Sequence, residues 1–266
     1  MAGADRRYWL LALDLDGTIV GLDLSVDPRD EAALAAARGR GLKVAACTGR
    51  PYSGAVHWVE RFQLTEPVIC YQGAQVRAAD GSLLLDHGIP HELAMEVIGF
   101  ARDRHLHVNA YRDDRLLVEH DTEEGREYAH HSGLAPEIVP DLDQAMGPTT
   151  PKLVIVAPIA VIDELLPVVR ERWRGRLFVA TSLPTYLEMT VPEADKGTAL
   201  EFLAGRLGVP QAETVAVGDG RNDRPMLAWA GLAVAVAGAP PEVLEVADRI
   251  IGPPGTGDLA MLLNEL

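Results

Sequence analysis

Three mostly apolar runs, each followed at once by a polar cluster, constrain this chain more than any other feature of its sequence. The runs are Tyr8–Leu13, Leu42–Cys47 and Thr214–Val217, and the clusters are Asp14-Leu15-Asp16-Gly17-Thr18, Thr48-Gly49-Arg50 and Gly218-Asp219-Gly220-Arg221-Asn222-Asp223. Short apolar runs of this kind suit strands that are buried on both faces, as in a parallel sheet. Ligands of open parallel sheets bind beyond the carboxyl ends of the strands. We therefore expect the three clusters to meet at one site.

Helical segments alternate with these strands. Asp27 is a good helix N-cap and Pro28 suits the first helical position, so a helix should begin there and end at Gly41. A second helix fits residues 52–62, and a third buried strand fits Val68–Tyr71. This alternation predicts a doubly wound α/β core, with a parallel sheet between two layers of helices.

The pattern changes over residues 81–189, which we interpret as an inserted α+β domain between core segments 1–80 and 190–266. His105–Tyr111 alternates between apolar and polar residues, as expected of a strand in a half-exposed sheet. His107, Asn109 and Tyr111 would lie on the exposed face as candidate substrate contacts. Lys152 is expected at the surface in a salt bridge.

Composition and charge exclude several classes of partner. Of 266 residues, 48% are hydrophobic, enough for two packed domains, and the net charge of −15 disfavours binding to nucleic acid or anionic lipid. The two cysteines, Cys47 and Cys70, end apolar runs and indicate no disulfide framework, so we expect a cytoplasmic protein. The apolar run before Asp14 is too short for a signal peptide or a membrane span. A monomer or homodimer is the default expectation.

Four carboxylates are expected to crowd the site: Asp14, Asp16, Asp219 and Asp223. Carboxylates that lie together repel one another and raise each other's pKa values, and a divalent cation relieves that repulsion. No pair of Cys or His residues has the spacing of metal ligands, so the expected ligands are oxygen atoms. Oxygen ligands predict Mg²⁺ as the cofactor in preference to Zn²⁺.

A magnesium ion beside a free carboxylate suits phosphoryl transfer. One aspartate can attack phosphorus to form an aspartyl-phosphate, and the second can protonate the leaving oxygen and later activate water. Thr48 offers a hydroxyl and Lys196 a cation to the phosphoryl oxygens. Taken alone, each motif has an ordinary structural explanation, such as a capped turn or a surface lysine. A dinucleotide-binding loop fits poorly, because Gly218 and Gly220 lack a third glycine.

Taken together, four elements of this sequence resemble the four ordered motifs of the haloacid dehalogenase superfamily. In chain order they are Asp14-Leu15-Asp16-Gly17-Thr18, Thr48, Lys196 and the Gly218–Asp223 cluster. The insert is similar to the type IIB cap of the Cof-like sugar-phosphate phosphatases. This resemblance implies a Rossmann-like core, a cap that closes over the substrate, and Mg²⁺-dependent hydrolysis of a small phosphorylated metabolite such as a sugar phosphate.

The resemblance also implies residue roles. Asp14 would be the nucleophile and a metal ligand, and Asp16 the general acid/base, with its backbone carbonyl on the metal. Asp219 would bind Mg²⁺, and Asp223 would support the metal shell. The residues implied to hold the phosphate or the rest of the substrate are Thr48, Gly49, Arg50, Lys196 and Asn222. Gln72-Gly73-Ala74 stands where Cof-like chains usually have Asn-Gly-Ala, so this chain departs from the family pattern at this position.

Two other functions stay open at this point. A phosphomutase of the phosphomannomutase type uses the same scaffold, and an isomerised sugar phosphate in place of free phosphate would reveal it. A non-enzymatic sensor of phosphorylated metabolites is the second alternative, and turnover of an aryl phosphate would exclude it.

Overall fold

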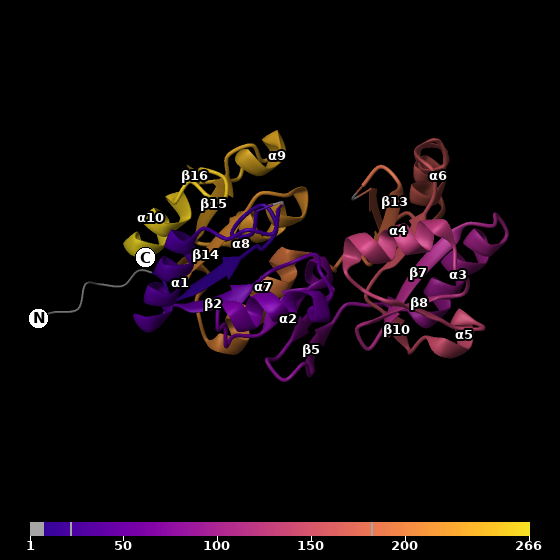
Figure 1. Cartoon of the computed structure of the whole chain (residues 1–266), viewed down its shortest axis with the longest axis horizontal. Helices are drawn as coiled ribbons and strands as arrows, with labels where there is room; N and C mark the ends of the chain where they lie inside the picture. Colours follow the sequence, from indigo (N-terminus) through magenta and orange to yellow (C-terminus); the bar gives the residue numbers. More distant parts are fainter. Residues whose placement is uncertain (1–7, 22, 182) are drawn as a thin grey trace, which may run out of the picture. The chain divides into compact units, whose positions relative to one another are not determined.

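The computed structural model describes residues 8–21, 23–181 and 183–266. The chain forms two compact units (Figure 1). The discontinuous unit comprises the described residues up to Leu85 together with Asp195–Leu266, and the inserted unit is Asp86–Ala194. The assignment of these units as catalytic core and cap stays a prediction.

A parallel sheet forms the centre of the discontinuous unit. Its strands, in spatial order, are β16 (Arg249–Ile251), β15 (Leu232–Val236), β14 (Thr214–Gly218), β1 (Leu10–Leu13) and β2 (Lys43–Ala46). The chain moves outward from β1 to β2 on one side and from β14 to β16 on the other, and all four pairings are parallel. The strand order therefore reverses between β1 and β14, the place where open α/β sheets bind ligands.

A small antiparallel sheet adjoins β2. It consists of β3 (Val68–Cys70), β4 (Gln75–Arg77) and β5 (Leu83–Asp86), and a bridge between Cys47 and Ile69 links it to the end of β2. The third strand expected from the sequence thus exists but ends one residue early. A 3₁₀ turn, η1 (Tyr71–Gly73), follows it directly.

Helices cover both faces of the parallel sheet, which confirms the doubly wound α/β class. They are α1 (Pro28–Gly39), α2 (Tyr52–Arg61), α7 (Lys196–Leu207), α8 (Arg224–Trp229), α9 (Pro241–Leu244) and α10 (Asp258–Glu265). Leu10 packs with apolar residues of α7 and α8, while Leu11 points the opposite way and is also fully buried. Figure 1 shows α1 and α10 side by side although they come from opposite ends of the chain. Asp27 caps α1 as predicted, since its side chain accepts a hydrogen bond from the backbone N–H of Arg29.

The inserted unit is an α+β unit built on a six-stranded sheet. Its strands, in spatial order, are β12 (Phe178–Thr181), β13 (Tyr186–Thr190), β11 (Leu153–Val156), β7 (His107–Arg112), β8 (Arg115–Val118) and β9 (Pro136–Ile138). The remaining elements are β6 (Ile89–Pro90), paired with β10 (Thr149–Thr150), and α3 (His91–Arg102), α4 (Glu123–Ser132), α5 (Leu142–Ala145) and α6 (Ile159–Arg172). Apolar residues of α3 and α6 pack on one face of the sheet, around Val108, Leu153 and Leu187.

The other face of this sheet is buried at β7, so the prediction that the polar face of this strand is exposed was wrong. Helix α4 packs on β7, with Gly125 against the His107 ring and the Tyr128 hydroxyl bonded to that of Tyr111. Asn109 is fully buried in the same row. Alternation of polar and apolar residues identified the two faces of β7 correctly, but it could not reveal that a polar helix covers the polar face.

Lys152 is buried as well, contrary to the surface position expected from the sequence. Only 5% of the residue is exposed, and its Nζ atom lies 3.4 Å from Oε1 of Glu188. A buried ammonium group needs a paired charge, and Glu188 supplies it from the neighbouring strand.

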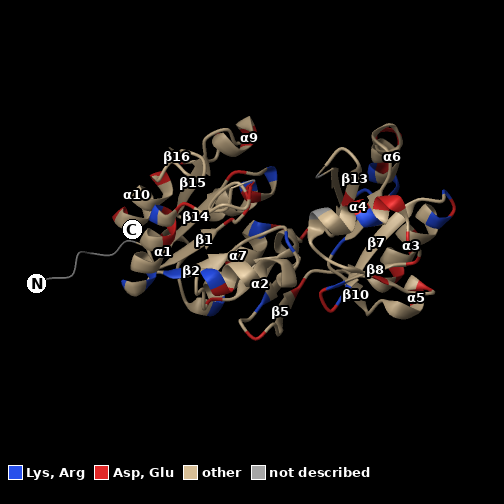
Figure 2. Cartoon of the chain, viewed as in Figure 1, with Lys and Arg blue, Asp and Glu red and all other residues tan. Residues whose placement is uncertain are grey.

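Charged residues are distributed over both units. Figure 2 shows Lys and Arg interspersed with Asp and Glu along the described elements. Within the described part of the chain, every helix is too short or too polar to cross a lipid bilayer.

Candidate active site

The predicted acidic site forms at the carboxyl ends of β1 and β14. Asp14 follows β1 directly, and its backbone N–H donates to the carbonyl of Val217 across the sheet at 3.0 Å. Carboxylate oxygens of Asp14, Asp219 and Asp223 all lie within 4.8 Å of one another. Among the described residues, no other group of three or more His, Cys, Asp or Glu residues converges in this way. The structure thus brings together three of the four aspartates expected at the site.

Glycine at position 17 makes this convergence possible. Gly17 has φ +85°, a left-handed conformation that favours glycine, and the Cβ that it lacks would lie 2.4 Å from Oδ2 of Asp219. The hydroxyl of Thr18 donates to Oδ1 of Asp219 at 3.1 Å. Thr18 was not among the residues predicted for the site, although its place directly after Gly17 was a signal that could have identified it.

Lys196 lies at the centre of the carboxylates. Its Nζ atom donates to Oδ1 of Asp14 at 2.6 Å and to Oδ1 of Asp223 at 2.5 Å, and the residue has no exposed surface. Burial alone would lower the pKa of Lys196, but the charges of Asp14 and Asp223 outweigh it and raise that pKa, so the side chain stays a cation. Taken alone, Lys196 suggested a solvated surface lysine, and that interpretation is wrong.

The N-terminus of α7 positions Lys196. Asp195 is the N-cap: its Oδ1 atom accepts hydrogen bonds from the backbone N–H groups of Gly197 and Thr198, at 2.7 and 2.9 Å. An aspartate directly before the lysine is a recognisable cap signal, yet Asp195 was not singled out from the sequence.

Asp223 organises the loop after β14. Its Oδ2 atom accepts the backbone N–H groups of Asp219 and Gly220, at 3.0 and 2.8 Å, within the 3₁₀ turn η3 (Arg221–Asp223). Since its Oδ1 atom is bound to Lys196, both oxygens of Asp223 already have protein donors. Asp14 and Asp219 therefore have more capacity left for a cation than Asp223 has.

The carboxylates repel one another. Burial raises the pKa of Asp14 well above its ordinary value, and the charge of Asp223 raises it further, although Lys196 opposes the shift. Burial, followed by Asp223, also raises the pKa of Asp219. Three carboxylates and one ammonium leave two negative charges, which a divalent cation would balance. The all-oxygen donor set fits Mg²⁺, with Asp14 and Asp219 as the side chains best placed to hold it.

Asp16 stands apart from this cluster. Its carboxylate is bound by Arg50, which donates from Nε to Oδ2 at 2.7 Å and from Nη2 to Oδ1 at 2.5 Å. The contact with Asp16 raises the pKa of Arg50 despite burial. Arg50, expected to reach the substrate, instead contacts the residue expected to act as general acid/base.

Thr48 and its loop lie beside the acidic cluster. Thr48 is fully buried, and its hydroxyl accepts the backbone N–H of Arg50 at 3.1 Å. Gly49 comes close to Asn222, whose Nδ2 atom lies 3.8 Å from the position of the Cβ that Gly49 lacks. The structure therefore gathers the predicted phosphate-binding residues from three separate loops. Cys47, next to Thr48, is an inert neighbour, since burial raises the pKa of its thiol and disfavours the thiolate.

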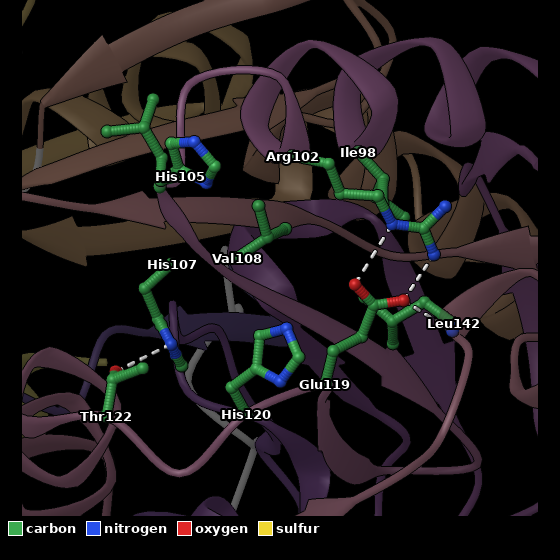
Figure 3. A pocket seen from close by; sticks show the side chains of 10 residues that line it. Ile98, Arg102, His105, His107, Val108, Glu119, His120, Thr122 and Leu142 are labelled. Atoms are coloured by element: carbon green, nitrogen blue, oxygen red, sulfur yellow. Dashed lines mark hydrogen bonds and ion pairs between the residues drawn. The ribbon is translucent and has the colours of Figure 1, made fainter.

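The inserted unit contains a separate cavity of about 210 Å³ (Figure 3). Its wall includes His105, His107 and His120, together with the ion pair of Arg102 and Glu119. Within the part of the chain that the structure describes, the three histidines do not converge on a shared metal position. Figure 3 shows that Arg102 occupies both oxygens of Glu119, so this cavity offers no free carboxylate for catalysis.

Comparison with known proteins agrees with this geometry. A family model described as haloacid dehalogenase-like hydrolase matches residues 11–256. The chain is 30% identical over 239 residues to the HMP-PP phosphatase of Serratia proteamaculans, with 89% of this chain and 86% of that protein covered. It is 25% identical over 278 residues to the 5-amino-6-(5-phospho-D-ribitylamino)uracil phosphatase YitU of Bacillus subtilis, with 98% of each covered.

A solved structure is similar over nearly the whole chain. The crystal structure of TM0651 from Thermotoga maritima superimposes with a TM-score of 0.90 and 31% identity, and 97% of each chain is covered. The similarity therefore includes the inserted unit as well as the parallel sheet.

Proposed function

This chain belongs to the haloacid dehalogenase-like hydrolases, in their Cof-like branch, and on that premise we propose that it hydrolyses a small phosphorylated metabolite through an aspartyl-phosphate on Asp14. The family and its phosphatase relatives make the chain a hydrolase of phosphoric monoesters. The substrates named for the two relatives are small phosphorylated compounds, which supports the same class of substrate here.

One observation carries the proposal: Lys196 binds both Asp14 and Asp223, and Asp219 lies beside them. This cluster lies where the strand order of the sheet reverses, between β1 and β14. The contact with Lys196 fixes the Asp14 carboxylate through Oδ1. A fixed oxygen beside a cationic group suits attack on an anionic phosphoryl group, because the ammonium reduces the repulsion between the two anions. Thr48, which follows β2, adds a hydroxyl donor at the same end of the sheet.

In the first proposed step, a carboxylate oxygen of Asp14 forms a bond to phosphorus and the ester P–O bond breaks. The leaving alkoxide takes a proton from Asp16, which must first release Arg50. In the second step, Asp16 accepts a proton from water, whose oxygen attacks phosphorus. The P–O bond to Asp14 then breaks, which yields inorganic phosphate and restores the carboxylate.

We further propose that Mg²⁺ is the cofactor, held by Asp14, Asp219 and the backbone carbonyl of Asp16, with Asp223 in support. When bound, the ion would screen the negative charge of the phosphoryl group. The residues of the chain then have separate tasks: Lys196 orients the nucleophile, and Asp223 fixes the loop that carries Asp219.

The test is release of inorganic phosphate from para-nitrophenyl phosphate and from a panel of phosphorylated metabolites, with and without Mg²⁺. We expect turnover that needs Mg²⁺ and is abolished in Asp14→Asn, with trapping of an acid-stable phosphoryl-protein adduct only when Asp14 is present. An Asp14→Asn variant that is folded and retains wild-type turnover would refute the role of Asp14. Isomerised substrate without free phosphate would indicate a mutase.

A further inference from the structure

Helix α4 covers the polar face of β7 but buries little of its own surface. Among its described residues only Gly125 and Tyr128 are buried, whereas α3, on the apolar side of the same sheet, buries six apolar residues. Regions with few buried apolar contacts open at a lower free energy than the rest of a fold. The attachment of α4 therefore depends on a small number of polar and aromatic contacts.

His107 holds the N-terminus of α4. Its Nδ1 atom lies 2.8 Å from the hydroxyl of Thr122, the N-cap, whose Oγ1 accepts the backbone N–H of Gly125 (Figure 3). Its Nε2 atom lies 3.0 Å from Oδ1 of Asn109 on the same strand. The ring also fills the space next to Gly125, because the Cβ that this glycine lacks would lie 2.5 Å from Cε1 of His107. One imidazole thus fixes the start of the helix by its hydrogen bonds and by its shape.

Tyr128 forms the second attachment. Its hydroxyl is hydrogen-bonded to the hydroxyl of Tyr111 on β7, and its ring meets that of Tyr186 in a T-shaped contact, with centroids 5.0 Å apart. Gly125 and Tyr128 lie about one helical turn apart, so both attachments are on one face of α4. That face can leave the sheet as a unit.

The layer beneath α4 contains groups that water would stabilise. Asn109 has no exposed surface, and its Nδ2 atom has no hydrogen-bond acceptor among the described residues. A buried donor without an acceptor is destabilising. The buried ion pair of Lys152 and Glu188 lies close by, with Nζ of Lys152 over the Tyr111 ring. Water entering beneath α4 would hydrate these groups, which lowers the free energy of an open form.

We propose that α4 is a detachable cover that acid releases from the sheet, while α3, α6 and the sheet itself stay folded. In the closed form the ring of His107 is buried, whereas in the open form it meets water and binds a proton at the ordinary histidine pKa. Opening exposes the row of His107, Asn109 and Tyr111 to solvent, on the face where the alternation of β7 predicted exposure.

Burial couples the cover to acid. It lowers the pKa of His107 in the closed form, although a hydrogen bond within the strand and the charge of Glu124 on α4 oppose the shift. His120, in the segment before α4, adds to the lowering. The other charged groups in this cavity wall, Arg102 and Glu119, form an ion pair without net charge. Because the open form binds the proton more readily, the closed form loses stability as the pH falls below about 6.5.

Hydrogen exchange of the full chain, followed by mass spectrometry at about pH 7.5 and about pH 5.5, tests the cover. Protection factors are corrected for the intrinsic exchange rate at each pH. We expect α4 to be less protected than α3 at both values, and acid to lower the protection of α4 alone, by up to about tenfold. In His107→Gln the protection of α4 should no longer depend on pH. The matched control, His105→Gln at an exposed position, should behave like the wild type.

A pair of glycine variants tests the same contact without a titrating group. Gly125→Ala places a methyl group against the His107 ring and should lower the protection of α4 about tenfold or more at neutral pH, with α3 unchanged. Gly99→Ala, in α3, is the matched control, because the added Cβ meets no atom within 4 Å and the gain in helix propensity is the same. It should leave α4 as in the wild type.

Three results would overturn the proposed cover. The first is equal protection of α4 and α3 in the wild type. The second is loss of protection throughout the inserted unit whenever α4 loses it, which would show that α4 does not open separately. The third is an equal effect of acid on α4 in the wild type and in His107→Gln.

Discussion

Arg50 binds both carboxylate oxygens of Asp16 through Nε and Nη2. In this arrangement, the residue proposed to donate a proton has both of its oxygens directed at a cation. To donate its proton, Asp16 must exchange its contact with Arg50 for a contact with the leaving oxygen during turnover. Binding of a phosphoryl group beside Arg50 would supply an alternative anion for the guanidinium and so release Asp16.

Asp16→Asn should reduce kcat about 10²- to 10⁴-fold, because an amide can neither donate the proton to the leaving oxygen nor take one from water. The amide can still accept a hydrogen bond from Arg50, so folding should be little affected. Steady-state kinetics with an alkyl phosphate measure the effect, and Asp80→Asn, at an exposed turn, is the control. A variant with unchanged kcat would remove Asp16 from the mechanism.

Lys196→Met should destabilise the folded protein by about 3–5 kcal/mol, the usual cost of removing one partner from a buried charge cluster. The loss leaves Asp14 and Asp223 without their shared cation. Urea unfolding at neutral pH measures it. Lys43→Met is the control: this lysine is partly exposed and lies 3.9 Å from Glu66, so its removal should cost at most about 1 kcal/mol. Equal losses in both variants would contradict the central position of Lys196.

Mg²⁺ should raise the thermal midpoint, because an ion that binds only the folded state stabilises it by about 2.7 kcal/mol at a concentration of 100 Kd. Binding also offsets the burial and the negative charge of Asp223, which are the two largest causes of the raised pKa values of Asp14 and Asp219. The shift should disappear in Asp219→Asn and persist in Asp248→Asn. Differential scanning fluorimetry after treatment with EDTA provides the measurement, and equal shifts in both variants would place the ion elsewhere.

His107 should make the stability of the protein sensitive to acid. Burial lowers the pKa of His107 below its ordinary value, although its contact with Asn109 opposes the shift. The unfolded chain therefore binds a proton at this position more readily, so the free energy of unfolding should fall as the pH drops below the ordinary histidine pKa of about 6.5.

Urea unfolding of wild type and His107→Gln, between about pH 5 and about pH 7.5, tests this expectation. The variant should lose less stability on acidification than the wild type does. His105→Gln, at an exposed neighbouring position, should behave like the wild type. Parallel curves for the wild type and His107→Gln would show that this histidine is not responsible.

The sequence was sufficient to predict the core of the fold because the relevant signals are local. The apolar run before Asp14 and the cap residue Asp27 depend on residues within one strand or one helical turn, and both interpretations are confirmed. The convergence of Asp14 and Asp219 was expected for a general reason, since parallel strands end at the same edge of a sheet.

Features that depend on distant packing could not be predicted in this way. Nothing near His107 in the sequence indicates that α4 covers it, because α4 buries few residues and is mostly polar. The left-handed turn at Gln72 depends on the loop of Thr48 and on Asp195, which lies more than a hundred residues away. The ion pair of Arg50 with Asp16 likewise depends on the fold that surrounds both side chains.

The interrupted layout of the chain has a consequence for its biosynthesis. Domains generally fold as units while the ribosome delivers the chain from its N-terminus. Asp86–Ala194 is contiguous and is complete before Thr214–Gly218 has been made. Until that strand arrives, β1 lacks the neighbour that pairs with it in the native sheet, and its apolar edge is open to association with other chains. The nascent polypeptide should therefore depend most on chaperones during translation of its final third.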